Sequence, residues 1–308
     1  MLEMIVSVLT RTIIAGTPLL LATLGEIISE RSGILNLGIE GMMSTGAVTA
    51  FIVTYITGNP WLGMLAAILA GMLLSSLHGF VSIGLRANQV VSGLALTMLG
   101  LGLSGLFGKS YIGRPLPNRM PRMEIPGLSD IPVLGSILFN HDWYVYLSVV
   151  IGIAIWFMLK HTSIGITLRS VGENPKAAES QGINVNRVKY FAVMAGGGLA
   201  GMAGAYLSTA YSGSWNEGIS AGRGWIVIAL TIFALWQPGG AFLGAYLFGG
   251  IFVLQYVLQP LGISPNLLSM LPYIATLLVL FIYGLSMSGQ RRMNAPATLG
   301  EPYVKGER

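Results

Sequence analysis

The sequence contains no cysteine, and only 9% of its 308 residues carry a charge. The absence of cysteine excludes disulfides and thiolate-bound metals. A soluble domain needs about 25% charged residues to cover its surface, so the low charge excludes an ordinary soluble protein. Histidine is also scarce, with three residues, and none has a carboxylate or second histidine at metal-ligand spacing. We therefore predict no metal site.

Hydrophobic residues make up 53% of the chain, and its mean hydropathy is +0.70. The formal net charge of +5 is spread along the chain and does not cluster with aromatic residues, which argues against nucleic-acid binding. Apolar stretches of about 20 residues, the length that crosses a bilayer, recur between polar linkers. We expect an all-α, polytopic transmembrane helical bundle that forms a single domain over residues 1–308.

The apolar stretches predict about nine spans, in a range of about eight to ten. They lie near 4–24, 34–57, 60–84, 88–107, 144–160, 189–211, 223–237, 239–258 and 266–286. The first stretch carries Glu3 where a signal peptide has a basic region, so we interpret it as a retained helix. Its Arg11 can extend to the lipid headgroups.

The distribution of Lys and Arg predicts the orientation of the chain. If the linker 161–188 and the tail 287–308 face the cytoplasm, eleven of these residues lie inside and five outside. Four of the eleven are in the tail: Arg291, Arg292, Lys305 and Arg308. The N-terminus is then outside, and residues 108–143 form a long extracytoplasmic loop.

The linker 161–188 contains a signal for a short helix. Asn174 followed by Pro175 matches an N-cap residue and a first helical residue, and Gly182 can end the helix in the left-handed conformation. An isolated helix of about two turns is marginal in water, so it should pack on other segments. On spacing alone, a capped turn in an ordinary linker is an equal alternative.

Three segments carry a family resemblance. The segment RSVGENPKAAESQGINVNRVK resembles the coupling-helix loop of permeases in the ribose, nucleoside and branched-chain amino acid branch of ABC importers. The segments ERSGILNLGIEGMMSTGAVTAF and GRGWIVIALTIFALWQPGGAFLGAYLFGG resemble the nucleoside and simple-sugar permeases of that branch. The ribose type has an Asp at or beside the position of Leu37.

The resemblance implies a permease subunit in the cell membrane that is not itself an enzyme and needs no cofactor. It implies a second, homologous permease chain, a cytoplasmic ATPase that binds the ATP, and an extracytoplasmic solute-binding protein. The implied solute is a nucleoside or, next, a simple sugar. The coupling helix that seats in the ATPase would comprise residues Gly172, Glu173, Asn174, Pro175, Lys176, Ala177, Ala178 and Gly182.

A few polar residues fall within or beside the spans. Asn36 and Glu40 are spaced i, i+4 on one predicted helix, so they would share a face. Glu40 either lines the solute pathway or is structural, bound to Arg31 or to backbone. Asn88 and Gln89 either line the exit or satisfy a helix end. We interpret His78 as an interhelical hydrogen-bond partner.

Glycines at GxxxG spacing, such as Gly197 with Gly201 and Gly240 with Gly244, predict close helix–helix contacts. Trp236 and Gln237 before Pro238 predict a break between two spans. Neither feature is specific for a solute.

Two other functions compete with the importer permease. An ion-coupled secondary transporter would place several ionisable groups at midplane, yet the predicted spans hold almost only Glu40 and His78. An intramembrane enzyme would need a nucleophile with a base or a metal site, and the sequence has no HExxH, paired-Asp or Ser-His-Asp pattern. A Walker A motif is absent as well, so ATP must be bound by a partner.

Overall fold

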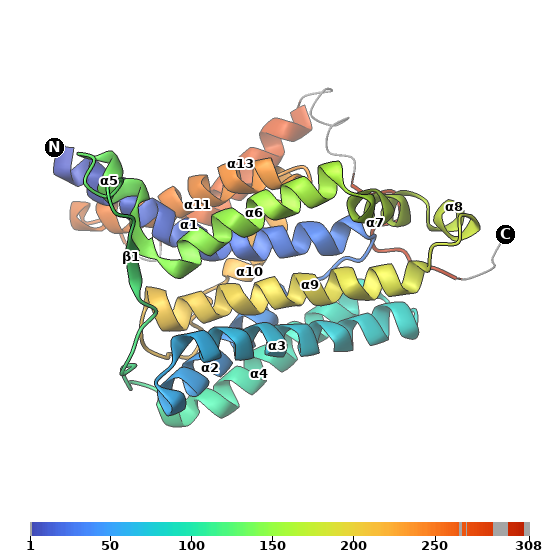
Figure 1. Cartoon of the computed structure of the whole chain (residues 1–308), viewed down its shortest axis with the longest axis horizontal. Coiled ribbons are helices and arrows are strands. Elements are labelled where there is room, and N and C mark those ends of the chain that lie inside the picture. Colours follow the sequence, from blue (N-terminus) through green and yellow to red (C-terminus); the bar gives the residue numbers. More distant parts are fainter. Residues whose placement is uncertain (1, 265–266, 269, 286–294, 305–308) are drawn as a thin grey trace.

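The computed structural model describes residues 2–264, 267–268, 270–285 and 295–304, and most of these are helical (Figure 1). The principal helices are α1 (Leu2–Arg31), α2 (Ile39–Thr57), α3 (Pro60–Gly79), α4 (Gln89–Gly108), α6 (Trp143–His161), α9 (Val185–Tyr206), α10 (Arg223–Phe233), α11 (Pro238–Leu258) and α13 (Leu271–Leu285). The predicted tail residues Arg291, Arg292, Lys305 and Arg308 lie outside the described residues.

Within the described residues, seven helices are long and apolar enough to cross a membrane: α1, α2, α3, α4, α6, α9 and α11. The helix α10 has 11 residues, which is short of a full crossing, and α13 is described over 15. The predicted helical bundle is confirmed, and the span count that the described helices support is seven.

The second span begins later than the sequence predicted. We expected it from residue 34, whereas α1 continues to Arg31 and α2 begins at Ile39. Residues 32–38 between them are not helical, and we call them the connector. Gly33 has φ of +88°, a left-handed conformation that ends α1 and turns the chain.

α9 lies at the centre of the bundle and packs on α1, α2 and α3. Glycines allow its backbone to touch theirs: a Cβ at Gly201 would lie 2.2 Å from Ala67 O, and one at Gly204 would lie 1.9 Å from Met43 O. Close approach of this kind is how helices associate in lipid. The predicted glycine contacts are confirmed for Gly197, Gly201 and Gly204, and on α11 for Gly240 and Gly244.

The bundle contains two similar units of opposite direction. In the first, α1 is followed by the connector, α2, α3 and α4; in the second, α9 is followed by residues 212–222, α10, α11 and α13. α1 packs on α11 as α9 packs on α3, and α10 lies against α1 as α2 lies against α9. α1 and α9 run antiparallel (Figure 1), so the units are inverted relative to one another.

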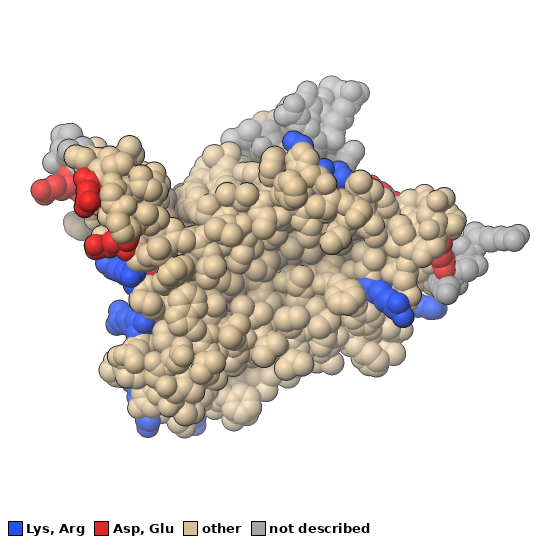
Figure 2. Space-filling view, in the orientation of Figure 1, with Lys and Arg blue, Asp and Glu red and all other residues tan. Residues whose placement is uncertain are grey.

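The two ends of the bundle carry different linkers. One end, here the β1 end, has η2 (Lys109–Tyr111), β1 (Arg122–Glu124), α5 (Leu134–Leu138) and β2 (Asn140–Asp142), with β1 and β2 paired antiparallel. The other, the α8 end, has α7 (Ser163–Glu173) and α8 (Pro175–Ser180). In Figure 2 most visible charges lie toward these two ends, and the surface over the middle of α9 and α3 is uncharged.

Candidate functional site

Glu40, in the first turn of α2, binds the start of α10 in the other unit. Its Oε1 accepts hydrogen bonds from Ser220 Oγ at 2.6 Å and Gly222 N at 2.9 Å. Its Oε2 accepts one from Gly224 N at 2.6 Å. A carboxylate here satisfies the free N–H groups and the positive end of the helix dipole. The two units are therefore joined through a buried carboxylate in the interior of the bundle.

The hydrogen bonds of Glu40 agree in part with the structural interpretation made from the sequence. The backbone hydrogen bonds are those of the structural interpretation, but Arg31 does not contribute, since its Nε donates to Trp236 O at 3.0 Å. Asn36 does not share a helix face with Glu40 because it lies in the connector, before α2 begins. Its Oδ1 accepts from Gly38 N at 3.0 Å. A role of Asn36 and Glu40 in a solute pathway stays a prediction.

Two further acids lie inside the bundle. The expectation that the spans hold almost only Glu40 and His78 is wrong, because α1 extends past residue 24 and carries Glu26 and Glu30, each 2% exposed. Glu26 Oε1 accepts from Asn36 N at 3.2 Å, Glu30 accepts from Trp236 Nε1, and the two side chains hydrogen-bond to each other. The sequence did hold a signal, since no proline stands between residue 24 and Ser32-Gly33.

Gln89 and His78 hold the connector in place. Gln89 Oε1 accepts from Leu35 N at 2.7 Å, and the ring of His78 contacts Leu35 O at 3.1 Å and Ser92 Oγ at 3.0 Å. The predicted interhelical role of His78 is confirmed. Asn88 caps α4, with its Oδ1 accepting from Val91 N at 3.1 Å. Of the two interpretations of Asn88 and Gln89, the contact of Asn88 is that of a helix-end residue, whereas Gln89 binds the connector. A pathway role of either residue stays a prediction.

The short helix predicted after Asn174 is present as α8. Asn174 Oδ1 accepts from Ala177 N at 3.0 Å, Pro175 is the first helical residue, and Gly182 has φ of +80°. Ala178 is buried in a small cluster with Val171 and Val185, while residues 173, 174, 176 and 177 are exposed. The sequence analysis missed α7, an amphipathic helix capped by Thr162, which joins α6 to α8.

A C-terminal segment lies across the base of α7 and α8. We call residues 295–304 the strap. Thr298 donates to Gly172 O through its N–H at 3.1 Å and its hydroxyl at 2.7 Å. Gly300 N donates to Gly33 O at 3.3 Å, and Tyr303 OH donates to Glu179 Oε2 at 2.5 Å. These contacts of the tail within the chain were not predicted, because no local pattern in the sequence indicates a pairing across more than 100 residues.

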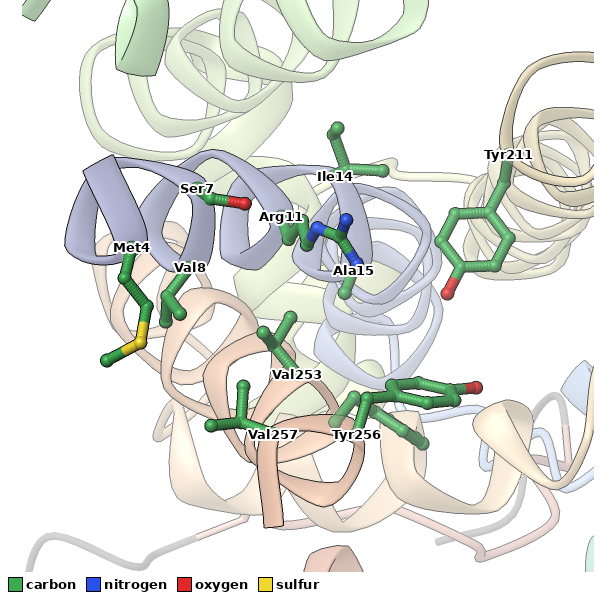
Figure 3. Close-up of a pocket in the computed structure, with 11 residues that line it drawn as sticks. Met4, Ser7, Val8, Arg11, Ile14, Ala15, Tyr211, Val253, Tyr256 and Val257 are labelled. Atoms are coloured by element: carbon green, nitrogen blue, oxygen red, sulfur yellow. The ribbon is translucent and has the colours of Figure 1, made fainter. Parts of the chain in front are cut away.

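Two cavities share Ile14 and Tyr211 near the β1 end. The first, of about 500 Å³, has Arg11 and Ala15 of α1 on one side and Val253 and Tyr256 of α11 on another (Figure 3). The second, of about 410 Å³, is lined by polar groups of the β1–β2 region, including Arg119, Arg122 and Asn140. Aromatic rings and guanidinium groups can stack on a planar part of a small solute, and the polar groups beside them can bind its hydroxyls.

Arg223 packs against two aromatic rings that line the first cavity. It is 7% exposed, and its guanidinium lies 5.6 Å from the Tyr211 ring centre and 5.0 Å from that of Phe252. Its Nε has no hydrogen-bond partner among the described residues. Arg223 is one of the five Lys and Arg residues that the sequence places outside, at the start of the predicted span 223–237, and nothing in its position indicated a buried contact.

Inverted units joined by interrupted segments are typical of membrane transport proteins, and the chain belongs to that class. It is a member of the family described as branched-chain amino acid transport system / permease component, whose model matches residues 8–280. The resemblance seen in the sequence is thereby confirmed. No solved structure matches the chain.

Characterised relatives extend over nearly the whole length of the chain. It is 40% identical to a putative glucose ABC transporter permease protein of Haloferax volcanii, with 96% of each chain covered. It is 38% identical to a guanosine ABC transporter permease protein of Bacillus subtilis, with 96% of each covered. It is 34% identical to a nucleoside ABC transporter permease protein of Lactococcus lactis subsp. cremoris, with 97% of each covered.

The first two organisms each hold a second, more distant permease that is similar to the chain. The one in Haloferax volcanii is 22% identical over 73% of the chain, and the one in Bacillus subtilis is 24% identical over 76%.

The sequence analysis also missed the inverted units, although a motif marks them. Ser-Gly-x-x-Asn-x-Gly-Ile occurs at 32–39 and again, 180 residues later, at 212–219. Each copy interrupts the chain between a long helix and the next, and both second positions, Gly33 and Gly213, have positive φ. A search for internal repeats would have found this motif.

Proposed function

We propose that the chain is the permease subunit of an ABC importer for nucleosides or simple sugars, situated in the cell membrane. The observation that carries the proposal is the capped, exposed helix α8, held at the end of a permease-family bundle where it can seat in another protein. The chain itself hydrolyses nothing, and ATP is bound by the partner ATPase.

In this proposal the chain crosses the membrane about nine times, the seven long helices being joined by α10 with residues 212–222 and by α13. The α8 end and the C-terminal tail face the cytoplasm, and the β1 end faces outward, as the Lys and Arg distribution predicts. Residues 1–308 act as one permease domain. Asn36, Glu40, Asn88 and Gln89 are candidates for the pathway.

The residues from Gly172 to Gly182 act as the coupling helix. Gly172 packs against the end of α1, since a Cβ there would lie 2.2 Å from Arg31 O. The exposed residues Glu173, Asn174, Lys176 and Ala177 form the face that seats in the ATPase. Closure of the ATPase on ATP moves this face, and a short element fixed at both ends transmits that movement.

The partners follow from the family. A second, homologous permease completes the pathway, as the two permeases of Haloferax volcanii and of Bacillus subtilis suggest. A solute-binding protein docks on the β1 end, and the cavities beside Tyr211 receive the solute. An ion-coupled transporter would use Glu26 and Glu30 as a proton site, and it would need no partner.

Reconstituted vesicles test the proposal. The chain, its second permease and its ATPase are incorporated together, the binding protein is added outside, and uptake of radiolabelled guanosine and glucose is measured with and without ATP. We expect ATP-dependent uptake of one of the two, lost when Asn174 and Lys176 are replaced by Asp. Uptake by this chain alone, driven by a proton gradient, would overturn the proposal.

A further inference from the structure

The strap connects the two functional parts of the α8 end. One side of it holds α7 and α8: Thr298 binds Gly172 O, Ala297 N donates to Glu173 Oε2 at 3.4 Å, and Tyr303 binds Glu179. The other side holds the connector, through the hydrogen bond of Gly300 N to Gly33 O. The strap therefore bridges segments that lie more than 130 residues apart in the sequence.

Tyr303 joins α8 to the start of α9 by three different contacts. Its ring joins the cluster of Val171, Ala178 and Val185 against which α8 is packed. Its hydroxyl binds Glu179, and its ring lies 5.7 Å from Nζ of Lys189. Lys189 is 1% exposed, and its ammonium has no hydrogen-bond partner among the described residues, so this ring is its stabilising contact. A helix as short as α8 depends on such packing.

Gln89 ties the strap to the connector a second time. Its Nε2 donates to Glu301 O at 3.4 Å while its Oε1 accepts from Leu35 N at 2.7 Å. The connector leads directly into α2, where Glu40 holds the start of α10. A continuous series of hydrogen bonds thus runs from α8 through the strap and the connector to the centre of the bundle.

We propose that the strap carries the movement of the coupling helix to the connector, with Thr298 and Tyr303 as positioning residues. This inference rests on the proposed function. Because the strap is fixed to α8 and to the connector at once, the three segments move as one body when the ATPase closes. Without the strap, α8 still binds the ATPase, but its movement reaches the connector only through the packing of Gly172 on the end of α1.

The test uses the reconstituted four-component complex with Thr298→Val combined with Tyr303→Leu. We expect uptake to fall at least about tenfold while ATP hydrolysis stays within about twofold, so that solute moved per ATP falls. Glu301→Gln is the matched control, because its exposed side chain lies on the strap and the strap uses only its backbone oxygen. Equal uptake in variant and wild type, or parallel loss of uptake and hydrolysis, would overturn the inference.

A second measurement is independent of transport. The chain has no cysteine, so spin labels can be placed at Ser180→Cys and Glu301→Cys, and separately at Ser180→Cys and Ser136→Cys. Ser180 is the exposed last residue of α8 and lies outside the face that seats in the ATPase. On addition of ATP we expect the 180–301 distance to stay constant and the 180–136 distance to change. A changing 180–301 distance refutes the strap, whereas failure of wild-type uptake with ATP would refute the proposed function.

Discussion

Replacing Glu40 tests whether its carboxylate holds α10 in place. In Glu40→Gln the amide oxygen can still accept from Ser220 and Gly222, but the amide NH₂ faces the N–H of Gly224, which Oε2 binds at 2.6 Å. The variant loses one hydrogen bond to a charged group and leaves a buried donor without a partner. Each effect costs about 1–3 kcal/mol, so we expect about 2–6 kcal/mol of destabilisation. Glu40→Ala removes three bonds and should cost about 4 kcal/mol or more.

The assay is unfolding of the purified chain in mixed micelles with increasing SDS, followed by tryptophan fluorescence. Trp225 lies in α10 and Trp215 in the segment before it, so both report on this region. Glu217→Gln is the matched control, because Glu217 is exposed on the same segment. If Glu40→Gln unfolds at the same SDS fraction as wild type and Glu217→Gln, the carboxylate does not hold α10 and the reasoning is wrong.

Three further predictions concern other parts of the chain. In the same SDS assay, Gly204→Ala should destabilise the fold by about 1–3 kcal/mol, because the added Cβ would lie 1.9 Å from Met43 O. Gly239→Ala is its control and should be neutral, because a Cβ there would have no atom within 4 Å. Asn174→Ala removes the cap of α8, worth about 1 kcal/mol, and should weaken ATPase binding several-fold in a pull-down titration without changing the SDS midpoint. Burial and the hydrogen bond to Glu179 raise the pKa of Tyr303 to about 12, so this contact should be complete below about pH 10 and be lost as the pH rises through about 12. A spin label at residue 301 should become mobile over that range, and Tyr303→Phe should remove the step; a step in the Tyr303→Phe variant would contradict this assignment.

Local patterns predicted the helices of this protein well. Long apolar stretches, the Pro at the starts of α3, α8 and α11, and the cap at Asn174 depend only on neighbouring residues, and each is found in the structure. The start of α2 was predicted wrongly, because residues 32–38 are apolar enough to continue a span although their glycines interrupt it. Hydropathy indicates whether a segment can lie in the membrane, but it does not indicate where the backbone of that segment stops being helical.

The contacts of the candidate site could not be predicted from local patterns. Glu40 meets Ser220 across 180 residues, and Tyr303 meets Glu179 across 124. Both pairs depend on how helices from different parts of the chain pack. The first pair could have been anticipated from the repeated motif, since Glu40 and Ser220 each directly follow a copy of it. No sequence pattern indicates the pair of Tyr303 and Glu179.

The inverted units have a consequence for how the chain inserts into its membrane. Basic residues hold their flanking segments on the cytoplasmic side during insertion. Two units that have the same shape but opposite directions must therefore differ in where their Lys and Arg residues lie. At the α8 end the first unit has Arg31, the last residue of α1, and Arg86, in the link from α3 to α4. The equivalent links of the second unit, 212–222 and 259–270, contain no Lys or Arg, and Arg223 is the first residue of α10. The presence of these arginines beside the links of the first unit, and their absence from the links of the second, therefore favours opposite directions of insertion, while the repeated glycines and asparagines give both units the same interrupted shape.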